Sequence, residues 1–117
     1  MDSNELKDRT RHFALDVIKV ASTIPSNRTA DIICRQLLRS ATSVGANYRA
    51  ACRARSRADF VSKITIVEEE ADESLYWLEL LIASNFGDAA VLNKLRKESD
   101  ELTAIFTAAG RTAKLKK

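Results

Sequence analysis

Helix breakers and the usual cofactor ligands are scarce in this sequence of 117 residues. It contains three Gly, one Pro and a single His, His12. So few Gly and Pro residues leave little material for the tight turns of an all-β protein, and long helices are favoured instead. One His and two Cys do not make a metal set, and neither a Gly-rich phosphate loop nor a Ser–His–Asp arrangement is visible. We therefore predict no cofactor, no metal site and no catalytic residues, with His12 as a surface or boundary residue of the first helix.

Long apolar segments are also absent. The amino terminus, MDSNELKDRT, is charged from its second residue, and no apolar run approaches the roughly 20 residues that a membrane-spanning helix requires. We expect a cytoplasmic protein with no membrane partner. Cys34 and Cys52 stand 18 residues apart in one predicted helix. Because that separation is roughly 27 Å along a helix, they cannot form a disulfide within the chain, and we predict two reduced thiols in the core.

Apolar residues make up 45% of the sequence and recur at spacings of three and four, as in the seam of a helical bundle. The candidate N-caps are Ser3, one of Ser26, Asn27 and Thr29, Ser56 or Asp59, and Asp88. The predicted helices run from Ser3 to Pro25, from Arg28 to about Arg55, from about Asp59 to Asn85 and from Asp88 to Gly110. Short connections make neighbouring helices antiparallel. We predict an all-α fold, an antiparallel up-down-up-down four-helix bundle in a single domain, residues 1–110, followed by a basic flexible tail, residues 111–117.

Charge is divided between the second and third predicted helices. Residues 28–57 contain seven Arg and one Asp, whereas residues 58–86 contain seven acidic residues and one Lys. At 100° per residue, six of the arginines fall within about 80° of arc, opposite the apolar face of the second helix. These six are Arg28, Arg35, Arg39, Arg49, Arg53 and Arg57.

This alignment of arginines has two interpretations. Guanidinium groups bind phosphate oxygens in bidentate fashion, so a linear array of them suits a nucleic-acid backbone. The same arginines can instead pair with Glu68, Asp72 and Glu79 of the third helix, in the same chain or in a neighbouring one. The two interpretations are compatible. The first gives these candidate nucleic-acid contacts: Arg35, Arg39, Arg49 and Arg53.

The acidic run allows a further alternative. Glu69, Glu70 and Glu73 have a Glu-Glu-x-x-Glu spacing, which places carboxylates on one side of a helix, and clustered carboxylates bind Mg²⁺. The spacing is similar to the first metal motif of the all-α nucleotide pyrophosphatases, which also need a second motif, Glu-x-x-Asp. Residues 97–100, Lys-Glu-Ser-Asp, miss that motif by one position. A Mg²⁺-dependent nucleotide hydrolase is therefore the least favoured hypothesis.

Two aromatic residues, Tyr76 and Trp77, follow the acidic run. Adjacent residues on a helix point about 100° apart, so at most one of the two can lie at the centre of the bundle. The other, beside Leu80, is more typical of a subunit contact than of a base-stacking platform. We predict an oligomer interface that contains Tyr76, Trp77, Glu68 and Asp72.

A family resemblance is carried by residues 37–81, LLRSATSVGANYRAACRARSRADFVSKITIVEEEADESLYWLELL. This segment resembles the bacterial four-helix-bundle proteins first noticed as products of intervening sequences in 23S ribosomal RNA genes. The similarity extends upstream and covers roughly residues 5–85. Residues 40–48 stand where the family usually has Ser-Ile-x-x-Asn-Ile-Ala-Glu-Gly. Asn47 fits the Asn of this pattern, whereas residues 50–52 depart from its ending, so the chain resembles a distinct branch.

The resemblance implies a homo-oligomer, in the form of a closed pentameric ring, with no catalytic activity known for the family. Relatives in diversity-generating retroelements resemble basic accessory proteins that associate with a reverse transcriptase and nucleic acid. The contacts in a ring are heterologous, so a basic surface of one chain can meet an acidic surface of the next. We therefore expect a non-enzymatic accessory factor that binds RNA, DNA or a ribonucleoprotein partner, mainly through phosphates. A purely structural or protein-interaction oligomer is the alternative.

Overall fold

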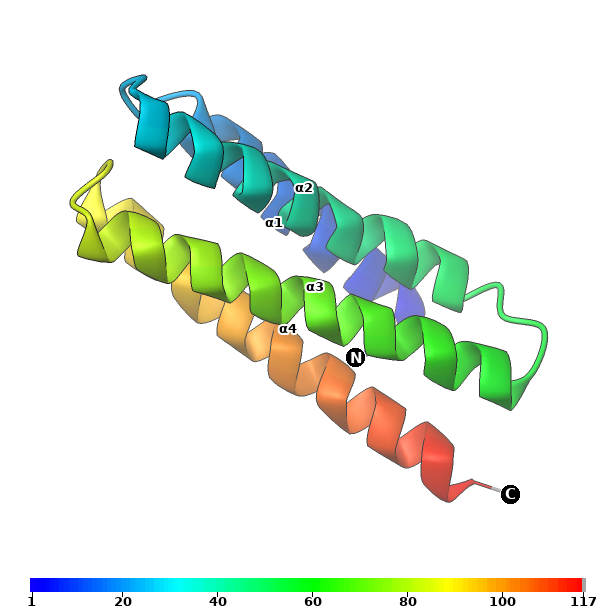
Figure 1. The fold of residues 1–117 in the computed structure, drawn as a ribbon. Coiled ribbons are helices and arrows are strands. Elements are labelled where there is room, and N and C mark those ends of the chain that lie inside the picture. The colour runs from blue at the N-terminus through cyan, green and yellow to red at the C-terminus, as the bar shows by residue number, and fades with distance from the viewer. Residues whose placement is uncertain (117) are drawn as a thin grey trace.

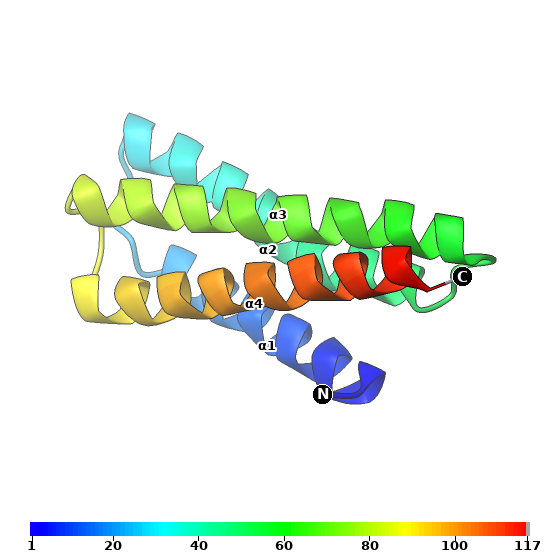
Figure 2. The same ribbon diagram turned by 90° about the horizontal axis from the view of Figure 1, so that it is seen from below.

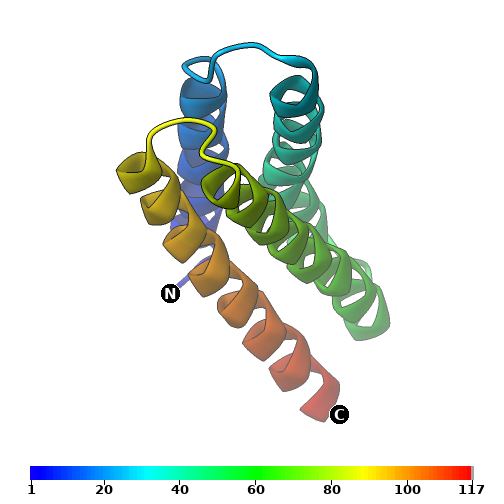
Figure 3. The ribbon, with the colours of Figure 1, turned by 60° about the vertical axis from the view of Figure 1, so that its left-hand side comes forward.

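The computed structural model describes residues 1–116 and confirms the predicted all-α fold. Within these residues it contains α1 (Ser3–Ala21), α2 (Arg28–Ala51), α3 (Arg57–Ala83) and α4 (Ala89–Leu115), and no strand. α1 and α2 form one antiparallel pair and α3 and α4 the other (Figure 1). The α1–α2 and α3–α4 connections lie at the same end of the molecule (Figure 3), which measures 50 × 21 × 19 Å. The arrangement is the predicted antiparallel four-helix bundle.

A short polar side chain caps the N-terminus of each helix. Asp2, Asn27, Ser56 and Asp88 each accept hydrogen bonds from backbone N–H groups two or three residues further on, at 2.8–3.2 Å. These bonds satisfy donors that the first helical turn leaves free. The prediction of Asp88 is confirmed, and Asn27 and Ser56 are the caps among the alternatives that the sequence left open. The first cap is Asp2 rather than Ser3.

The core follows the predicted apolar seams. Phe13, Leu37, Leu78 and Phe106 come from all four helices and are fully buried. The ring of Tyr48 packs against Phe106 with a centroid distance of 5.3 Å. Burial of side chains of this size, at roughly 1.5–3 kcal/mol each, is the main stabilising contribution to such a bundle.

Small and polar residues let the helices approach closely inside this core. The hydroxyls of Ser40 on α2 and Ser74 on α3 lie 2.9 Å apart, and both residues are fully buried. Ser99 on α4 donates a hydrogen bond of 2.8 Å to the backbone carbonyl of Ala71 on α3. Every buried hydroxyl of this layer therefore has a partner, and the layer fixes how α2, α3 and α4 lie against one another.

Three helix ends differ from the prediction. α1 ends at Ala21, several residues before Pro25. α2 stops at Ala51 instead of about Arg55, because the chain turns so that Ser56 can cap α3. α4 continues past Gly110 to Leu115, so most of the expected tail is helical, while Lys117 lies outside the described residues. Two buried positions explain this extension. Gly110 packs closely against Ile64, and Ala113 stays buried one turn later.

The α3–α4 connection needs its glycine. Gly87 has a φ of 96°, in the left-handed region, and a Cβ built on it would lie 3.0 Å from the side chain of Ile24. Asn85 also has a left-handed φ, 60°, which Asn tolerates better than most residues. No helix among residues 1–116 is long and apolar enough to cross a membrane.

Candidate nucleic-acid interface

The arginines of α2 lie on its outward side. Eight residues, spaced alternately four and three apart, place one side chain from each turn on this side of the helix. All eight are exposed. None of the eight residues is acidic, although Asp31, the one acid of α2, is exposed within one turn of both Arg28 and Arg35. We call this set the arginine row: Arg28, Ile32, Arg35, Arg39, Thr42, Ala46, Arg49 and, just past the helix end, Arg53.

The prediction that six arginines share one helix is wrong at its C-terminal end. α2 ends at Ala51, so Arg53 lies in the α2–α3 connection and Arg57 is the first residue of α3. The spacing of the arginines continues unbroken through this connection, which is why the sequence pattern did not mark the end of the helix. The other four arginines do lie on α2.

Arg39 is held by α3 of the same chain. Its Nη1 lies 3.4 Å from Oε2 of Glu70, and its Nη2 forms an ion pair with Glu73. Glu73 also accepts a hydrogen bond of 3.3 Å from the indole N–H of Trp77. These pairs are partly exposed, and such pairs contribute little to stability. They nevertheless orient the Arg39 side chain along the α2–α3 seam.

Within one chain, the predicted acids Glu68, Asp72 and Glu79 therefore do not pair with the arginines, and their pairing with a neighbouring chain stays a prediction. Glu68 turns to the other side of α3, where its Oε2 accepts a hydrogen bond of 2.7 Å from Thr107 on α4. Asp72 and Glu79 point outward and are exposed. Glu70 and Glu73 are the acids on the side of α3 that faces α2. The rotation of α3 about its own axis determines which of its acidic side chains face α2.

The remaining arginines of the row have no acidic partner. Among residues 1–116, no carboxylate oxygen lies within 4.0 Å of the guanidiniums of Arg28, Arg35, Arg49 and Arg53. Three of these four belong to the predicted nucleic-acid contacts, while the fourth predicted contact, Arg39, is engaged by α3. Four exposed guanidiniums along one face, none of them in an ion pair, can each bind a phosphate of one nucleic-acid backbone.

The acidic run of α3 is not arranged as a metal site. Glu70 and Glu73 are turned toward Arg39, whereas Glu69 is exposed. In the part of the chain that the structure describes, no three His, Cys, Asp or Glu side chains come together as metal ligands. His12 lies at the surface, with its Nδ1 2.9 Å from the carbonyl oxygen of Asp8.

Tyr76 and Trp77 divide as their spacing predicts. Trp77 is half-buried at the edge of the core, whereas 53% of Tyr76 is exposed, and their rings meet edge to face at 5.1 Å. Tyr76 belongs to an exposed set on α3 with the same alternating spacing as the arginine row. We call this set the acidic row: Ala58, Ser62, Thr65, Glu69, Asp72, Tyr76, Glu79 and Ala83.

The prediction of two core thiols is wrong for Cys52. Cys34 is half-buried, but Cys52 is exposed because it is the C-cap residue of α2, where the chain leaves the bundle. Both thiols are free. Burial raises the pKa of the Cys34 thiol, and the carboxylate of Asp31 raises it further.

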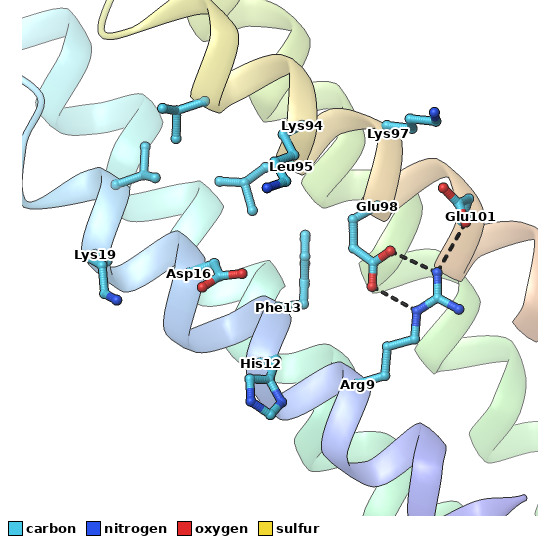
Figure 4. A pocket seen from close by; sticks show the side chains of 12 residues that line it. Arg9, His12, Phe13, Asp16, Lys19, Lys94, Leu95, Lys97, Glu98 and Glu101 are labelled. Carbon is cyan, nitrogen blue, oxygen red and sulfur yellow. Dashed lines mark hydrogen bonds and ion pairs between the residues drawn. The ribbon is translucent and has the colours of Figure 1, made fainter.

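A groove between α1 and α4 has no signal in the sequence. It has a volume of about 790 Å³ and an apolar floor formed by Phe13, Val20, Val91 and Leu95. Charged and polar side chains from both helices surround this floor (Figure 4). They are Arg9, His12, Asp16 and Lys19 from α1 and Lys94, Lys97, Glu98 and Glu101 from α4. The groove depends on how two helices far apart in the chain meet, so local spacing does not reveal it.

One end of the groove is closed by Arg9. Its guanidinium donates to Glu98 at 2.8 and 2.7 Å and to Glu101 at 3.2 Å. The Glu98 carboxylate raises the pKa of Arg9 above its ordinary value, and Glu101 adds to this effect. The other charged side chains of the groove make no ion pair among the described residues.

Comparison with known proteins decides the family. The family model of the 23S rRNA-intervening sequence proteins matches residues 2–108, nearly the whole bundle. The chain belongs to this family. The match confirms the resemblance seen in residues 37–81 and extends it through most of α4.

A solved structure agrees with this assignment. The 23S rRNA-intervening sequence protein described here is similar to a protein of unknown function of the S23 ribosomal protein family from Bacteroides thetaiotaomicron, at 33% identity and a TM-score of 0.85. The alignment covers 95% of this chain and 99% of that chain, so the similarity extends over nearly the full length of both. No curated protein matches the sequence.

Proposed function

We propose that this 23S rRNA-intervening sequence protein is a non-enzymatic, cytoplasmic accessory factor that binds nucleic acid, or a ribonucleoprotein partner, through the arginine row. The observation that carries the proposal is the set of exposed guanidiniums of Arg28, Arg35, Arg49 and Arg53, none of which has a carboxylate oxygen within 4.0 Å, on a face whose single exposed acid on α2 is Asp31. Such an excess of positive charge on one face attracts polyanions.

The length of the arginine row suits a nucleic-acid backbone. Arg28 and Arg49 are 21 residues apart on one straight helix, which is roughly 32 Å, or about nine phosphates of one strand of a duplex. Between the arginines stand Ile32, Thr42 and Ala46. Because these side chains cannot make bidentate hydrogen bonds to base edges, binding is largely independent of sequence.

The proposal includes assembly into a homo-oligomer, a closed pentameric ring. The exposed aromatic Tyr76, in a row otherwise made of acids and small residues, supports a subunit contact on α3. The separation of positive and negative faces on α2 and α3 supports a heterologous contact. Five chains of 13.0 kDa give a mass of about 65 kDa, which light scattering distinguishes from a single chain.

The experiment is a fluorescence-anisotropy titration of labelled single- and double-stranded RNA and DNA at several salt concentrations. The test variant is Arg35→Glu/Arg49→Glu, and the matched control is Arg11→Glu/Arg111→Glu, whose arginines are exposed on α1 and α4. Both variants lower the net charge from +3 to −1. We expect the logarithm of the binding constant to fall less steeply with the logarithm of the salt concentration in the test variant, by the amount that about two phosphate contacts contribute to the slope. The slope of the control should stay unchanged.

Two outcomes contradict the proposal. The first is no binding by the wild-type protein at low salt, and the second is an equal loss of affinity in both variants at unchanged oligomer mass. The second candidate is a purely structural oligomer whose charges serve its own contacts. The ion pairs of Arg39 with Glu70 and Glu73 show that acids can occupy an arginine of the row, here within one chain. That candidate predicts loss of the oligomer, and not of any nucleic-acid binding, in Arg39→Glu/Arg49→Glu.

A further inference from the structure

We infer that the groove between α1 and α4 binds the acidic row of α3 from a second copy of this chain. The inference rests on the proposed homo-oligomer and identifies the two surfaces that join one chain to the next. Tyr76 and Asp72, which the sequence placed in an interface, form one surface. The groove, which the sequence did not reveal, forms the other.

The groove has an apolar floor, and its border carries four basic and three acidic side chains. Arg9 pairs with Glu98 and Glu101, which leaves Lys19, Lys94 and Lys97 against the single acid Asp16. Phe13 and Leu95 form the deep part of the floor, and Val91 is 43% exposed, although it lies beside them. Lys94 extends beside Leu95, while Lys19 and Lys97 extend outward from the two opposite rims (Figure 4). These three ammonium groups have no acidic partner among residues 1–116.

The acidic row has the complementary properties. It carries Glu69, Asp72 and Glu79, has no basic residue, and contains one large aromatic side chain, Tyr76, that is 53% exposed. Its spacing of alternating four and three residues forms a straight ridge along a helix, the arrangement that packs between two helices of a partner. In this docking, the Tyr76 ring meets the apolar floor and the carboxylates meet the lysines.

The groove of one chain cannot be filled by its own α3. α3 packs against α2 and α4 of its own bundle, and its acidic row points away from that bundle. The arginine row of α2 is not a suitable occupant either, since it would bring guanidiniums onto the lysines of the groove. A second copy of α3 therefore fits the charge pattern. The contact is heterologous, so it can repeat around a ring and leave the arginine row exposed to phosphates.

Charge reversal tests the contact. In Lys94→Glu/Lys97→Glu the border of the groove repels the acidic row, and we expect the mass in light scattering to fall to that of one chain. Adding Asp72→Lys/Glu79→Lys to the same chain restores opposite charges, and we expect the oligomer to return. The matched control is Arg111→Glu/Lys114→Glu, two exposed cations of α4 that do not line the groove, and it should keep the wild-type mass.

The outcomes separate this inference from the proposed function. If the wild-type protein is a single chain at micromolar concentration, the proposed oligomer and the inference both fail. If the wild type is an oligomer and Lys94→Glu/Lys97→Glu keeps its mass, the inference is wrong while the proposed function stands.

A second measurement is independent of charge. In a Cys34→Ser/Cys52→Ser background, Tyr76→Cys and Val91→Cys are introduced together, and the assembled protein is oxidised. The inference predicts covalent dimers and higher multimers on a denaturing gel, because residue 76 of one chain lies against residue 91 of the next. Each single variant serves as a control and can give at most dimers. Recovery of only single chains on the gel, from an oxidised double variant that keeps the wild-type oligomer mass in light scattering, overturns the inference.

Discussion

The guanidinium of Arg9 on α1 donates to both carboxylate oxygens of Glu98 on α4, at 2.8 and 2.7 Å. Both side chains are largely sheltered, with 25% and 29% of their surfaces exposed. The ion pairs that join α1 to α4 within residues 1–116 all involve Arg9. This bidentate ion pair, which we call the Arg9–Glu98 fork, therefore sets the position of α1 at one end of the groove.

Arg9→Lys should weaken the attachment of α1. Lys keeps the charge but cannot donate two parallel hydrogen bonds to one carboxylate, so we expect a loss of about 1 kcal/mol in the free energy of unfolding. Urea denaturation measures this loss, and Arg11→Lys, on the exposed side of the same helix, should change it by less than about 0.5 kcal/mol. Equal effects of the two substitutions would contradict the role given to the fork.

Gly45→Ala should destabilise the protein although Ala favours a helix. A Cβ on Gly45 would lie 3.2 Å from Oγ1 of Thr10, which is fully buried and held by bonds to the carbonyls of Leu6 and Lys7. We expect a net loss of about 1 kcal/mol, because the crowding exceeds the gain of roughly 1 kcal/mol in helix propensity. In a Thr10→Ala background the same substitution should become neutral or stabilising. A double-mutant cycle of urea midpoints checks the change of sign.

Ser99 should tolerate a smaller residue far better than a larger one. Its hydroxyl donates a hydrogen bond of 2.8 Å to the Ala71 carbonyl in a fully buried layer. Ser99→Ala loses one buried hydrogen bond, for which we expect about 1 kcal/mol. Ser99→Leu adds volume to a fully buried contact between α3 and α4, and we expect a loss of more than about 2 kcal/mol. Thermal unfolding measures both, with Ser62→Ala on the exposed face as a control that leaves the midpoint unchanged.

Asp59 should contribute to acid sensitivity. Lys63 donates a bond of 2.6 Å to its carboxylate and the backbone N–H of Arg55 one of 3.1 Å, which together lower the pKa of Asp59 below its usual value. A lowered pKa means that the stabilisation is complete above the unfolded pKa, about 4, and is lost as pH falls through the folded value. Urea midpoints between pH 6 and pH 2 should therefore fall less steeply in Asp59→Asn. If the urea midpoints of the wild type and of Asp59→Asn fall equally steeply as the pH is lowered, this account is wrong.

The two thiols should differ in reactivity. Cys52 is exposed, whereas Cys34 is half-buried with a raised pKa, and the thiolate is the reacting species. We expect iodoacetamide to modify Cys52 of the native protein first, and Cys52→Ser to remove the fast phase. In urea the two rates should converge. Mass spectrometry of the labelled peptides distinguishes the two sites.

The helices and their buried faces could be predicted because their signals are local. Phe13 and Leu37 repeat with the helical period, and Asn27 or Asp88 caps a helix through its own neighbours, so no distant contact is needed to place them. Helix ends were less predictable. The arginine spacing runs through residues 52–56 without a break, and only the cap at Ser56 ends α2.

Contacts between helices could not be predicted in the same way. Arg39 pairs with Glu70 and Glu73 instead of Asp72 because the packing of the core sets the rotation of α3. The groove likewise requires α1 to cross α4 at an angle, while α3 and α4 run side by side (Figure 2). The sequence contains the residues of both features, but neighbours in the chain do not show which residues meet.

The short first helix has a consequence for amide hydrogen exchange. α1 has 19 residues against 27 in α4, and it packs against α4 more sparsely than α3 does. Segments with few tertiary contacts open locally at a lower free energy than the rest of a domain. Amides of α1 should therefore exchange with solvent sooner than those of α3. Because α1 forms one wall of the groove, a partner helix seated there would slow exchange in α1 selectively, and the exchange rate of one helix would report on assembly.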